Sequence, residues 1–253
     1  MKINNNFFNY YIKSFNNITS SNPKTNIGTG NSSRLIDPYY NILFAGNTKK
    51  YSNEIEEIED NLATIGINAY LKDKCNYKNL LVAKSIQDAF VDIINAGFHI
   101  PKGIAVHCDE AQENFDHNSR DMAYTDVTSI KREKPEIHLN TPRYRSKKGV
   151  PYAFHNIGDK RIYNTKVDIY HEFAHCYQAI KDRANYLRLG EQEFDEANKK
   201  EISKCINDYA TTNKAEFVAE YFAYKLAGIK VTSDKIDLEK LYNECKGPRS
   251  RKF

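Results

Sequence analysis

Apolar residues recur at helical spacing in two segments of the N-terminal half. Residues 54–65 place acidic side chains between apolar positions that share one helical face, namely Ile55, Ile58, Leu62 and Ile65. Residues 86–94 repeat this amphipathic pattern, and Gly97 and Pro101 follow at its end. Both segments are therefore predicted to be helices with one buried face. The acids of the first helix are expected to form a solvated face rather than a site.

Two short runs have the composition of β-strands. They cover residues 103–108 and 136–140, and the second reads Glu-Ile-His-Leu-Asn. Pro135 and Pro142 border this second run, which is typical of an edge strand because proline lacks the N–H that a sheet interior requires. His138 within it is interpreted as an ordinary strand residue rather than a catalytic one. The polar segments that flank the run are predicted as surface loops over 109–133 and 141–165.

The C-terminal half is predominantly helical in pattern. Helices are predicted over residues 166–181, 191–207, 214–226 and 233–245. Gly228 follows the third of these, and Ser233 is a candidate N-cap for the fourth. Strands that come early and helices that dominate late predict an α+β fold, with residues 34–253 forming one domain.

Composition and charge narrow the class of protein. Lys and Arg number 37 and Asp and Glu number 33, so the net charge of +4 is too small and too dispersed to indicate a nucleic-acid partner. The chain lacks the run of about 20 apolar residues that a membrane-spanning helix needs. The cysteines are odd in number, widely spaced and without a CxxC pair, which favours a reducing compartment over a disulfide framework; they are Cys75, Cys108, Cys176, Cys205 and Cys245.

The first 33 residues form a polar tail rich in Asn, Ser and Thr, and the first acidic residue is Asp37. Asn, Tyr and Lys interrupt the apolar residues of segment 7–13, so no secretory signal peptide is expected. Such a composition cannot bury enough apolar surface to order itself, which predicts a disordered tail. The alternative interpretation is an unfolded export signal of a bacterial injection system.

The strongest chemical signal is an H-E-x-x-H motif at residues 171–175. Because residues four apart share a helical face, His171 and His175 can present their imidazoles to one ion, and Zn²⁺ is the expected metal. Glu172 is expected to act as the general base on a metal-activated water. The surrounding helix is apolar nearly all round and is predicted to be buried, with apolar residues Val167, Ile169, Tyr170, Phe173, Ala174, Tyr177 and Ile180.

A hydrolytic zinc site requires a third protein ligand, and no His or Gly follows His175 at the spacing of a metzincin. Glu216 and Glu220 lie four residues apart on a later predicted helix, so they share a face. Glu216 is the predicted third ligand, and Glu220 is predicted to orient a ligand imidazole from behind. Thr212 or Asn213 is expected to cap this helix, and its small residues, Ala215, Ala219 and Ala223, would allow close approach to the motif helix.

Together, H-E-F-A-H at 171–175 and Y-A-T-T-N-K-A-E-F-V-A-E at 209–220 resemble the catalytic domain of anthrax lethal factor and the related clostridial Pro-Pro endopeptidases. These are zinc metallopeptidases of the gluzincin type, and the resemblance covers roughly residues 85–230. It departs from the family pattern at Ala174, where glycine is usual, and at Val218 and Tyr221. None of these departures removes a reactive group.

The resemblance implies a zincin-like fold and a role for each matching residue. His171, His175 and Glu216 would hold zinc, and Glu172 would be the base. Tyr209 would donate a hydrogen bond to the oxyanion of the tetrahedral intermediate or assist the leaving amine. The family also has a strand that lines the cleft, for which residues 136–140 are the candidate and to which an extended substrate would add.

The sequence therefore predicts a monomeric zinc endopeptidase of protein or peptide substrates. Its substrate is expected to be a host protein, reached after secretion by a non-Sec route into the host cytosol. Two alternatives stay open. One is a zincin-like module that binds a partner without hydrolysing it, and the other is a metallopeptidase that acts on bacterial or extracellular material.

Overall fold

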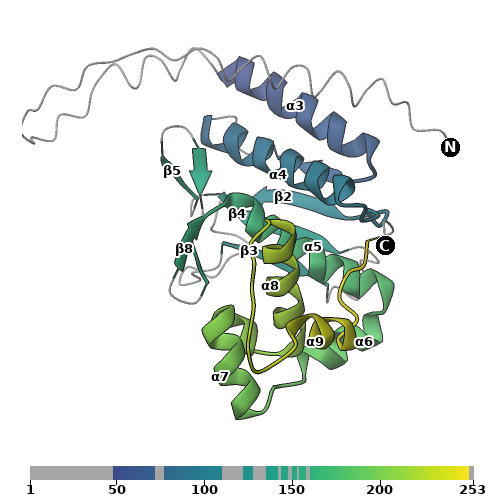
Figure 1. Cartoon of the computed structure of the whole chain (residues 1–253). Coiled ribbons are helices and arrows are strands. Elements are labelled where there is room, and N and C mark those ends of the chain that lie inside the picture. The colour runs from purple at the N-terminus through teal and green to yellow at the C-terminus, as the bar shows by residue number, and fades with distance from the viewer. Residues whose placement is uncertain are drawn as a thin grey trace, which may run out of the picture. The chain divides into compact units, whose positions relative to one another are not determined.

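The structure is a computed structural model of the 253-residue chain. It describes residues 48–71, 77–109, 122–127, 135–141, 144–147, 150–152, 154–157 and 160–250. These ranges form an α+β structure in which helices predominate over a small mixed sheet (Figure 1). The predicted polar tail over residues 1–33 and Cys75 lie outside the described residues.

Both amphipathic patterns of the N-terminal half form helices, α3 (Thr48–Thr64) and α4 (Tyr77–Asn95), which pack against each other. Each begins earlier than the apolar spacing predicted. In α4 the extra length continues the buried face, because Leu80 and Val82 are as inaccessible as the predicted Ile86. The expected apolar face of α3 is buried at Ile55, Ile58 and Leu62.

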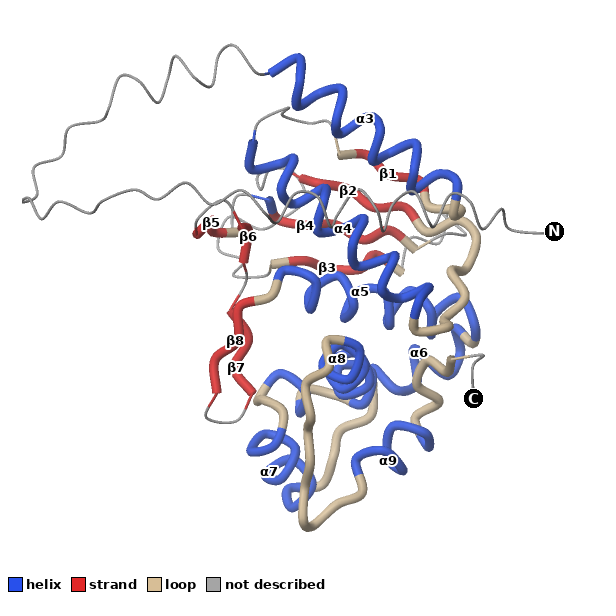
Figure 2. Tube along the Cα trace, turned by 45° about the horizontal axis from the view of Figure 1, so that its top comes forward, coloured by secondary structure: helices blue, strands red, loops and turns tan. Residues whose placement is uncertain are grey.

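Four strands form the main sheet in the order β1-β2-β4-β3 (Figure 2). They are β1 (Asn68–Tyr70), β2 (Ala105–Asp109), β3 (Ala123–Asp126) and β4 (Glu136–Asn140). Strands β1, β2 and β4 run parallel to one another, and β3 runs antiparallel to β4. The buried residues of β2 and β4 that form the core are Val106, Cys108, Ile137 and Leu139.

The prediction that residues 136–140 form an edge strand is wrong. β4 is an interior strand, paired with β2 on one side and with β3 on the other. Pro135 lies just before the strand, so its lack of an N–H removes no hydrogen bond from the sheet. Its carbonyl accepts a hydrogen bond from the Ala105 N–H at 3.2 Å. The edge next to β4 is formed by β3, within a segment that was predicted as a surface loop. Its sequence, Ala-Tyr-Thr-Asp, is too short and polar to show an alternating pattern.

Two antiparallel hairpins lie in the second predicted loop, 141–165, so that prediction is also wrong. The first pairs β5 (Arg145–Lys147) with β6 (Val150–Tyr152), and the second pairs β7 (Phe154–Ile157) with β8 (Lys160–Tyr163). Strands of three or four residues bury little apolar surface, so hydrophobic periodicity does not reveal them.

The rest of the chain is helical. The elements are α5 (Thr165–Lys181), α6 (Arg183–Gly190), α7 (Glu196–Cys205), the 3₁₀ turn η2 (Tyr209–Thr211), α8 (Lys214–Leu226) and α9 (Leu238–Glu244). The predicted helices 166–181 and 214–226 match α5 and α8 within one residue at each end. No helix among the described residues is long and apolar enough to cross a membrane.

The remaining helix predictions need correction. The segment 191–207 contains only the shorter α7, and α6 precedes it unpredicted. The last helix begins at Leu238, because Asp237 rather than Ser233 caps it. The Ser233 hydroxyl instead accepts from the N–H groups of Lys235 and Ile236, which forms a separate turn before the helix.

α5 is the central element of the described residues. It contacts α4, β3 and β4, and it also packs against α8. Phe173 of α5 meets Phe90 of α4 edge to face at 6.2 Å between ring centroids and Phe222 of α8 at 5.9 Å. The prediction of a buried motif helix is confirmed except at its last turn, where Ile180 is 40% exposed. Helix α5 thus joins the sheet to the C-terminal helices.

Candidate metal centre

Helix α5 brings His171 and His175 together on one face. Asn164 caps the start of this helix by accepting from the Lys166 N–H at 3.0 Å. Both imidazoles are buried, and their Nε2 atoms lie 2.9 Å apart. The rings meet nearly edge to face, at an interplanar angle of 74°. Two ring nitrogens are therefore aimed at one point.

Helix α8 brings a carboxylate to the same point. Glu216 Oε2 lies 3.1 Å from His171 Nε2 and 3.2 Å from His175 Nε2. Of the two predicted caps, Asn213 is the one used. Its side chain accepts from the N–H groups of Ala215 and Glu216, each at 2.9 Å, which fixes the first turn of α8. The alanines expected at the helix contact are buried, at positions Ala215, Ala219 and Ala223.

The three ligand atoms fit a single tetrahedral cation. Zinc bonds of about 2.0–2.1 Å at tetrahedral angles separate neighbouring ligand atoms by roughly 3.3–3.4 Å. The observed separations of 2.9, 3.1 and 3.2 Å need only a small expansion to reach that value. Two imidazoles and one carboxylate are also the donor set of known hydrolytic zinc sites. The residues present therefore fit a zinc ion, with one position left for water or substrate.

The charges of the cluster support each other. Burial by itself lowers the pKa of His171, but the carboxylates of Glu216 and Glu220 raise that pKa well above its ordinary value. Burial by itself raises the pKa of Glu216, but His175 and His171 lower it well below its usual range. Glu216 is thus held as a carboxylate, which is the form that binds a cation.

Glu220 and Tyr186 contact the Nδ1 atoms of the two imidazoles. Glu220 Oε1 lies 3.0 Å from His171 Nδ1, as predicted from the i, i+4 spacing of the two glutamates. Asn207 Nδ2 donates to Glu220 Oε2 at 2.8 Å and so fixes the carboxylate. The Tyr186 hydroxyl of α6 lies 3.3 Å from His175 Nδ1. Contacts of this kind select which ring nitrogen carries the proton and orient the other toward a metal.

Glu172 is buried next to the cluster and contacts the edge strand. The Thr125 hydroxyl of β3 donates to Glu172 Oε2 at a distance of 2.5 Å. Burial raises the pKa of Glu172, and the two histidines and Thr125 oppose that rise. A buried carboxylate with a raised pKa takes up a proton more readily than an exposed one, which suits a general base. Thr125 was not predicted, because it belongs to the unrecognised strand.

Tyr209 lies next to His171 of the cluster and is exposed. It begins the turn η2, and its ring centroid lies 5.8 Å from that of His171. Its side chain is 54% exposed. The turn is held by Asn207, whose Oδ1 accepts from the Ala210 N–H at 2.8 Å. Asn207 thereby connects the position of Tyr209 to that of Glu220. The sequence predicted Asn207 as the last residue of a helix and gave no signal for this role.

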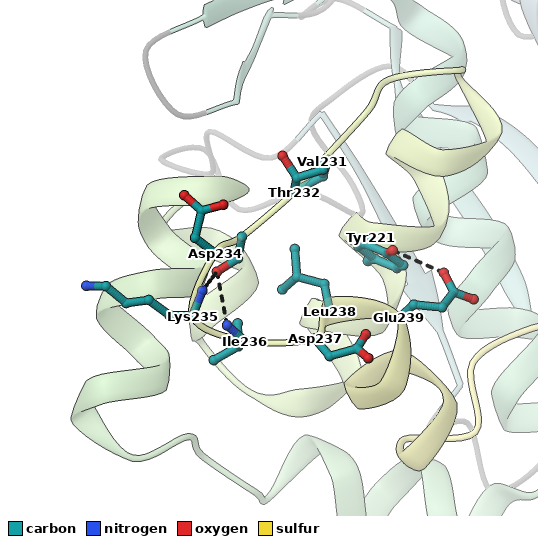
Figure 3. A pocket seen from close by; sticks show the side chains of 10 residues that line it. Tyr221, Val231, Thr232, Asp234, Lys235, Ile236, Asp237, Leu238 and Glu239 are labelled. Atoms are coloured by element: carbon teal, nitrogen blue, oxygen red, sulfur yellow. Dashed lines mark hydrogen bonds between the residues drawn. The ribbon is translucent and has the colours of Figure 1, made fainter.

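A separate surface pocket of about 440 Å³ contains none of these residues. Figure 3 shows it between α8 and the segment that leads into α9, with Tyr221 donating to Glu239 over 3.1 Å. Asp234 and Asp237 also line it. It carries no histidine, so the chemistry predicted for the His171, His175 and Glu216 group is not located there.

Comparison with protein-family models, with curated proteins and with solved structures found no match in any of the three.

Proposed function

We propose that this chain is a zinc-dependent endopeptidase with a zincin-like fold. The observation that carries the proposal is the convergence of two imidazoles from α5 and one carboxylate from α8, with separations of 2.9–3.2 Å, beside the buried Glu172. His171, His175 and Glu216 would hold the ion. When bound, zinc would supply Lewis acidity to water and to a peptide carbonyl.

Each neighbouring residue has a chemical role in this proposal. Glu172 takes the proton from the attacking water and passes it to the leaving amine. Thr125 holds the Glu172 carboxylate in position through its hydroxyl. Tyr209, exposed beside His171, donates to the oxyanion or assists the leaving amine. Glu220 and Tyr186 orient the two imidazoles.

The edge strand β3 supports an extended substrate. Within the described part of the chain it pairs only with β4, and its Thr125 touches the proposed base. A peptide that adds to an exposed strand edge is held by main-chain hydrogen bonds, which places a backbone carbonyl next to the site independently of side-chain sequence. This role moves from residues 136–140, where the sequence suggested it, to residues 123–126.

We further propose that the substrate is a host protein, reached by a non-Sec route, as the composition of the polar tail suggests. Among the described residues, Cys108, Cys176, Cys205 and Cys245 are free thiols, which agrees with activity in a reducing compartment such as the host cytosol.

The catalytic part of the proposal is tested with Glu172→Gln. This variant should keep zinc, because Glu172 is not a ligand, and should lose cleavage. The measurement is a survey of new protein N-termini in host lysate treated with wild type, with Glu172→Gln, or with wild type and a zinc chelator. New termini are expected only in the first sample. Equal cleavage by wild type and Glu172→Gln would refute the assignment of the base. Wild type that retains a partner but forms no new termini would indicate a binding module instead.

The ligand assignment is tested with Glu216→Ala. This variant should lose the zinc ion that His171, His175 and Glu216 would hold, and elemental analysis after dialysis measures the zinc content. Glu193→Ala is the matched control, because Glu193 is an exposed glutamate that pairs with Lys199 outside the cluster. Equal zinc loss, or equal zinc retention, in the two variants would show that Glu216 is not the third ligand.

A further inference from the structure

A second group of metal-ligating side chains lies on the main sheet. It consists of His107 on β2 and Glu136 and His138 on β4. His107 and His138 are directly paired in the parallel register. Glu136 precedes His138 by two residues, and residues two apart on a strand point to the same face. All three side chains therefore project from one face of the sheet.

That face is opposite to the one that carries the first cluster. Val106 and Ile137, which alternate with the histidines, are fully buried in the hydrophobic core. Thr125 is paired with Ile137 and so shares the core face, where it reaches Glu172. Tyr124 is paired with His138 and shares the other face. The alternation of the strands thus places the two histidine groups on the two sides of one sheet.

Four stacked rings include these two imidazoles. Tyr70, His107, His138 and Tyr124 occupy one register line across β1, β2, β4 and β3, which Figure 2 shows side by side. Successive ring centroids are 4.7, 4.7 and 4.6 Å apart, with interplanar angles of 16°, 8° and 4°. The stack places the two imidazoles on adjacent strands, with their edges level and their planes nearly parallel. A metal lies in the plane of each imidazole that binds it, so one of the two rings turns out of the stack when both bind a single ion.

Glu136 closes the group. Its Oε2 lies 3.8 Å from His107 Nε2 and 3.6 Å from His138 Nε2. These separations exceed the roughly 3.3–3.4 Å of a tetrahedral zinc site by about 0.5 Å or less, and all three ligand atoms lie within 4.8 Å of one another, so rotation of Glu136 and of one imidazole brings them to that spacing. The side chains are 24%, 14% and 9% exposed for His107, Glu136 and His138, so the group is partly shielded yet reachable from solvent.

We propose that His107, His138 and Glu136 form a second zinc site, separate from the proposed catalytic centre. Its donor set is again two imidazoles and one carboxylate, which favours Zn²⁺ over hard cations such as Mg²⁺ or Ca²⁺. The ion cross-links β2 to β4, next to the edge strand β3. The inference does not depend on peptidase activity, because it concerns different residues on the other face of the sheet.

The test is the zinc content of the full-length chain at a free zinc concentration set by a chelating buffer. Wild type is expected to hold two ions per chain, and Glu136→Gln and His138→Gln one each. Glu216→Ala should also hold one, and Glu136→Gln combined with Glu216→Ala close to none. His99→Gln is the matched control, because His99 is an exposed histidine outside both groups, and it should keep two ions. Circular dichroism checks that each variant is folded.

The change in Tm on adding zinc provides a second readout besides zinc content. In the Glu216→Ala background, added zinc should raise the Tm, and Glu136→Gln should abolish that rise while preserving the volume of the side chain. A zinc content in Glu216→Ala that is unchanged by Glu136→Gln and by His138→Gln would overturn the second site. One ion in wild type and none in Glu216→Ala would overturn it as well. One ion in both wild type and Glu216→Ala, lost in Glu136→Gln, would support the second site and count against the first.

Discussion

Thr125 and Glu172 come from elements that are far apart in the chain, and their contact influences both the charge and the orientation of the proposed base. Burial raises the pKa of Glu172, whereas the hydroxyl of Thr125 donates to the carboxylate over 2.5 Å and opposes that rise. A buried charged group needs such a donor, because desolvation otherwise favours its neutral form. Together with the two histidines, Thr125 therefore favours the ionised form of Glu172, and its hydroxyl also orients the carboxylate.

Replacing Thr125 by Val should lower kcat/KM for peptide cleavage by on the order of tenfold, which corresponds to about 1.4 kcal/mol. Valine preserves the shape of the side chain but removes the donor, so Glu172 is left less well oriented. Zinc content should not change, because no ligand is touched. Thr125→Ser is the control, since it retains the hydroxyl. A Thr125→Val variant that cleaves peptide as fast as wild type would exclude this role.

At the scale of elements, the N-terminus of α8 positions Glu216, the proposed third ligand. Asn213 accepts two backbone N–H groups, one of them from Glu216 itself. An N-cap of this kind stops the first turn from fraying, and that turn contains Glu216. The cap therefore links a local stabilising interaction to the geometry of the proposed metal centre.

Asn213→Ala should destabilise the protein by about 1 kcal/mol and weaken zinc binding. The loss of the cap frays the turn that holds Glu216, so both effects have one cause. Urea unfolding measures the free energy, and competition with a coloured chelator measures the zinc affinity. Asn213→Asp retains a capping oxygen and should behave like wild type. A loss of stability with unchanged zinc affinity would separate the cap from the site.

The N-cap of α6 supplies a pH-dependent contribution to stability. Asp182 accepts from the Asn185 N–H at 3.0 Å and pairs with Lys246 at 3.1 Å, and these contacts lower its pKa below the ordinary value. The carboxylate is therefore stabilised in the folded state. Its contribution is present above the unfolded pKa of about 4 and disappears as the pH falls through the lower folded value.

Asp182→Asn keeps a capping oxygen but removes the charge that faces Lys246. The Tm of this variant should be lower than that of wild type at pH 6, and the difference should shrink as the pH falls below about 4. Thermal unfolding across this range, followed by circular dichroism, provides the measurement. A difference that grows toward acid would contradict the assigned direction of the pKa.

At the scale of the whole described structure, α5 joins two layers through a chain of aromatic rings. Phe173 lies between Phe90 of α4 and Phe222 of α8, at 6.2 and 5.9 Å. The same helix carries His171 and His175, so the packing of its buried face also determines where the imidazoles point. Stability and site geometry are therefore coupled through one residue.

Phe173→Ala should lower the free energy of unfolding by about 3–5 kcal/mol, because it removes a fully buried ring and leaves a cavity between three helices. Zinc affinity should fall as well, since α5 and α8 lose a contact that holds them together. Ile180→Ala on the same helix is the control, and its cost should be below about 1 kcal/mol because Ile180 is 40% exposed. Equal costs in urea unfolding would show that Phe173 does not anchor the layers.

Long periodic helices were the part of the fold that the sequence predicted best. The apolar positions of α5 and α8 recur over several turns, so their limits are correct to within one residue. The short strand β3 and the hairpins β5–β8 were missed, since three or four residues cannot show a period. Residues 136–140 were predicted to be an edge strand because prolines border them. Bordering prolines do not show which strands pair with a segment, and the neighbouring strand β3 was not recognised.

The sequence by itself determined which groups are available for chemistry. His171 and His175 share a face because four residues span about one helical turn, and Glu216 and Glu220 do so for the same reason. Only the tertiary structure decided which distant groups meet them. Thr125, Tyr186 and Asn207 contact the cluster through the packing of separate elements, and His107 meets Glu136 and His138 through strand register. Spacing rules describe neighbours on one element, whereas contacts between elements depend on how their buried faces pack.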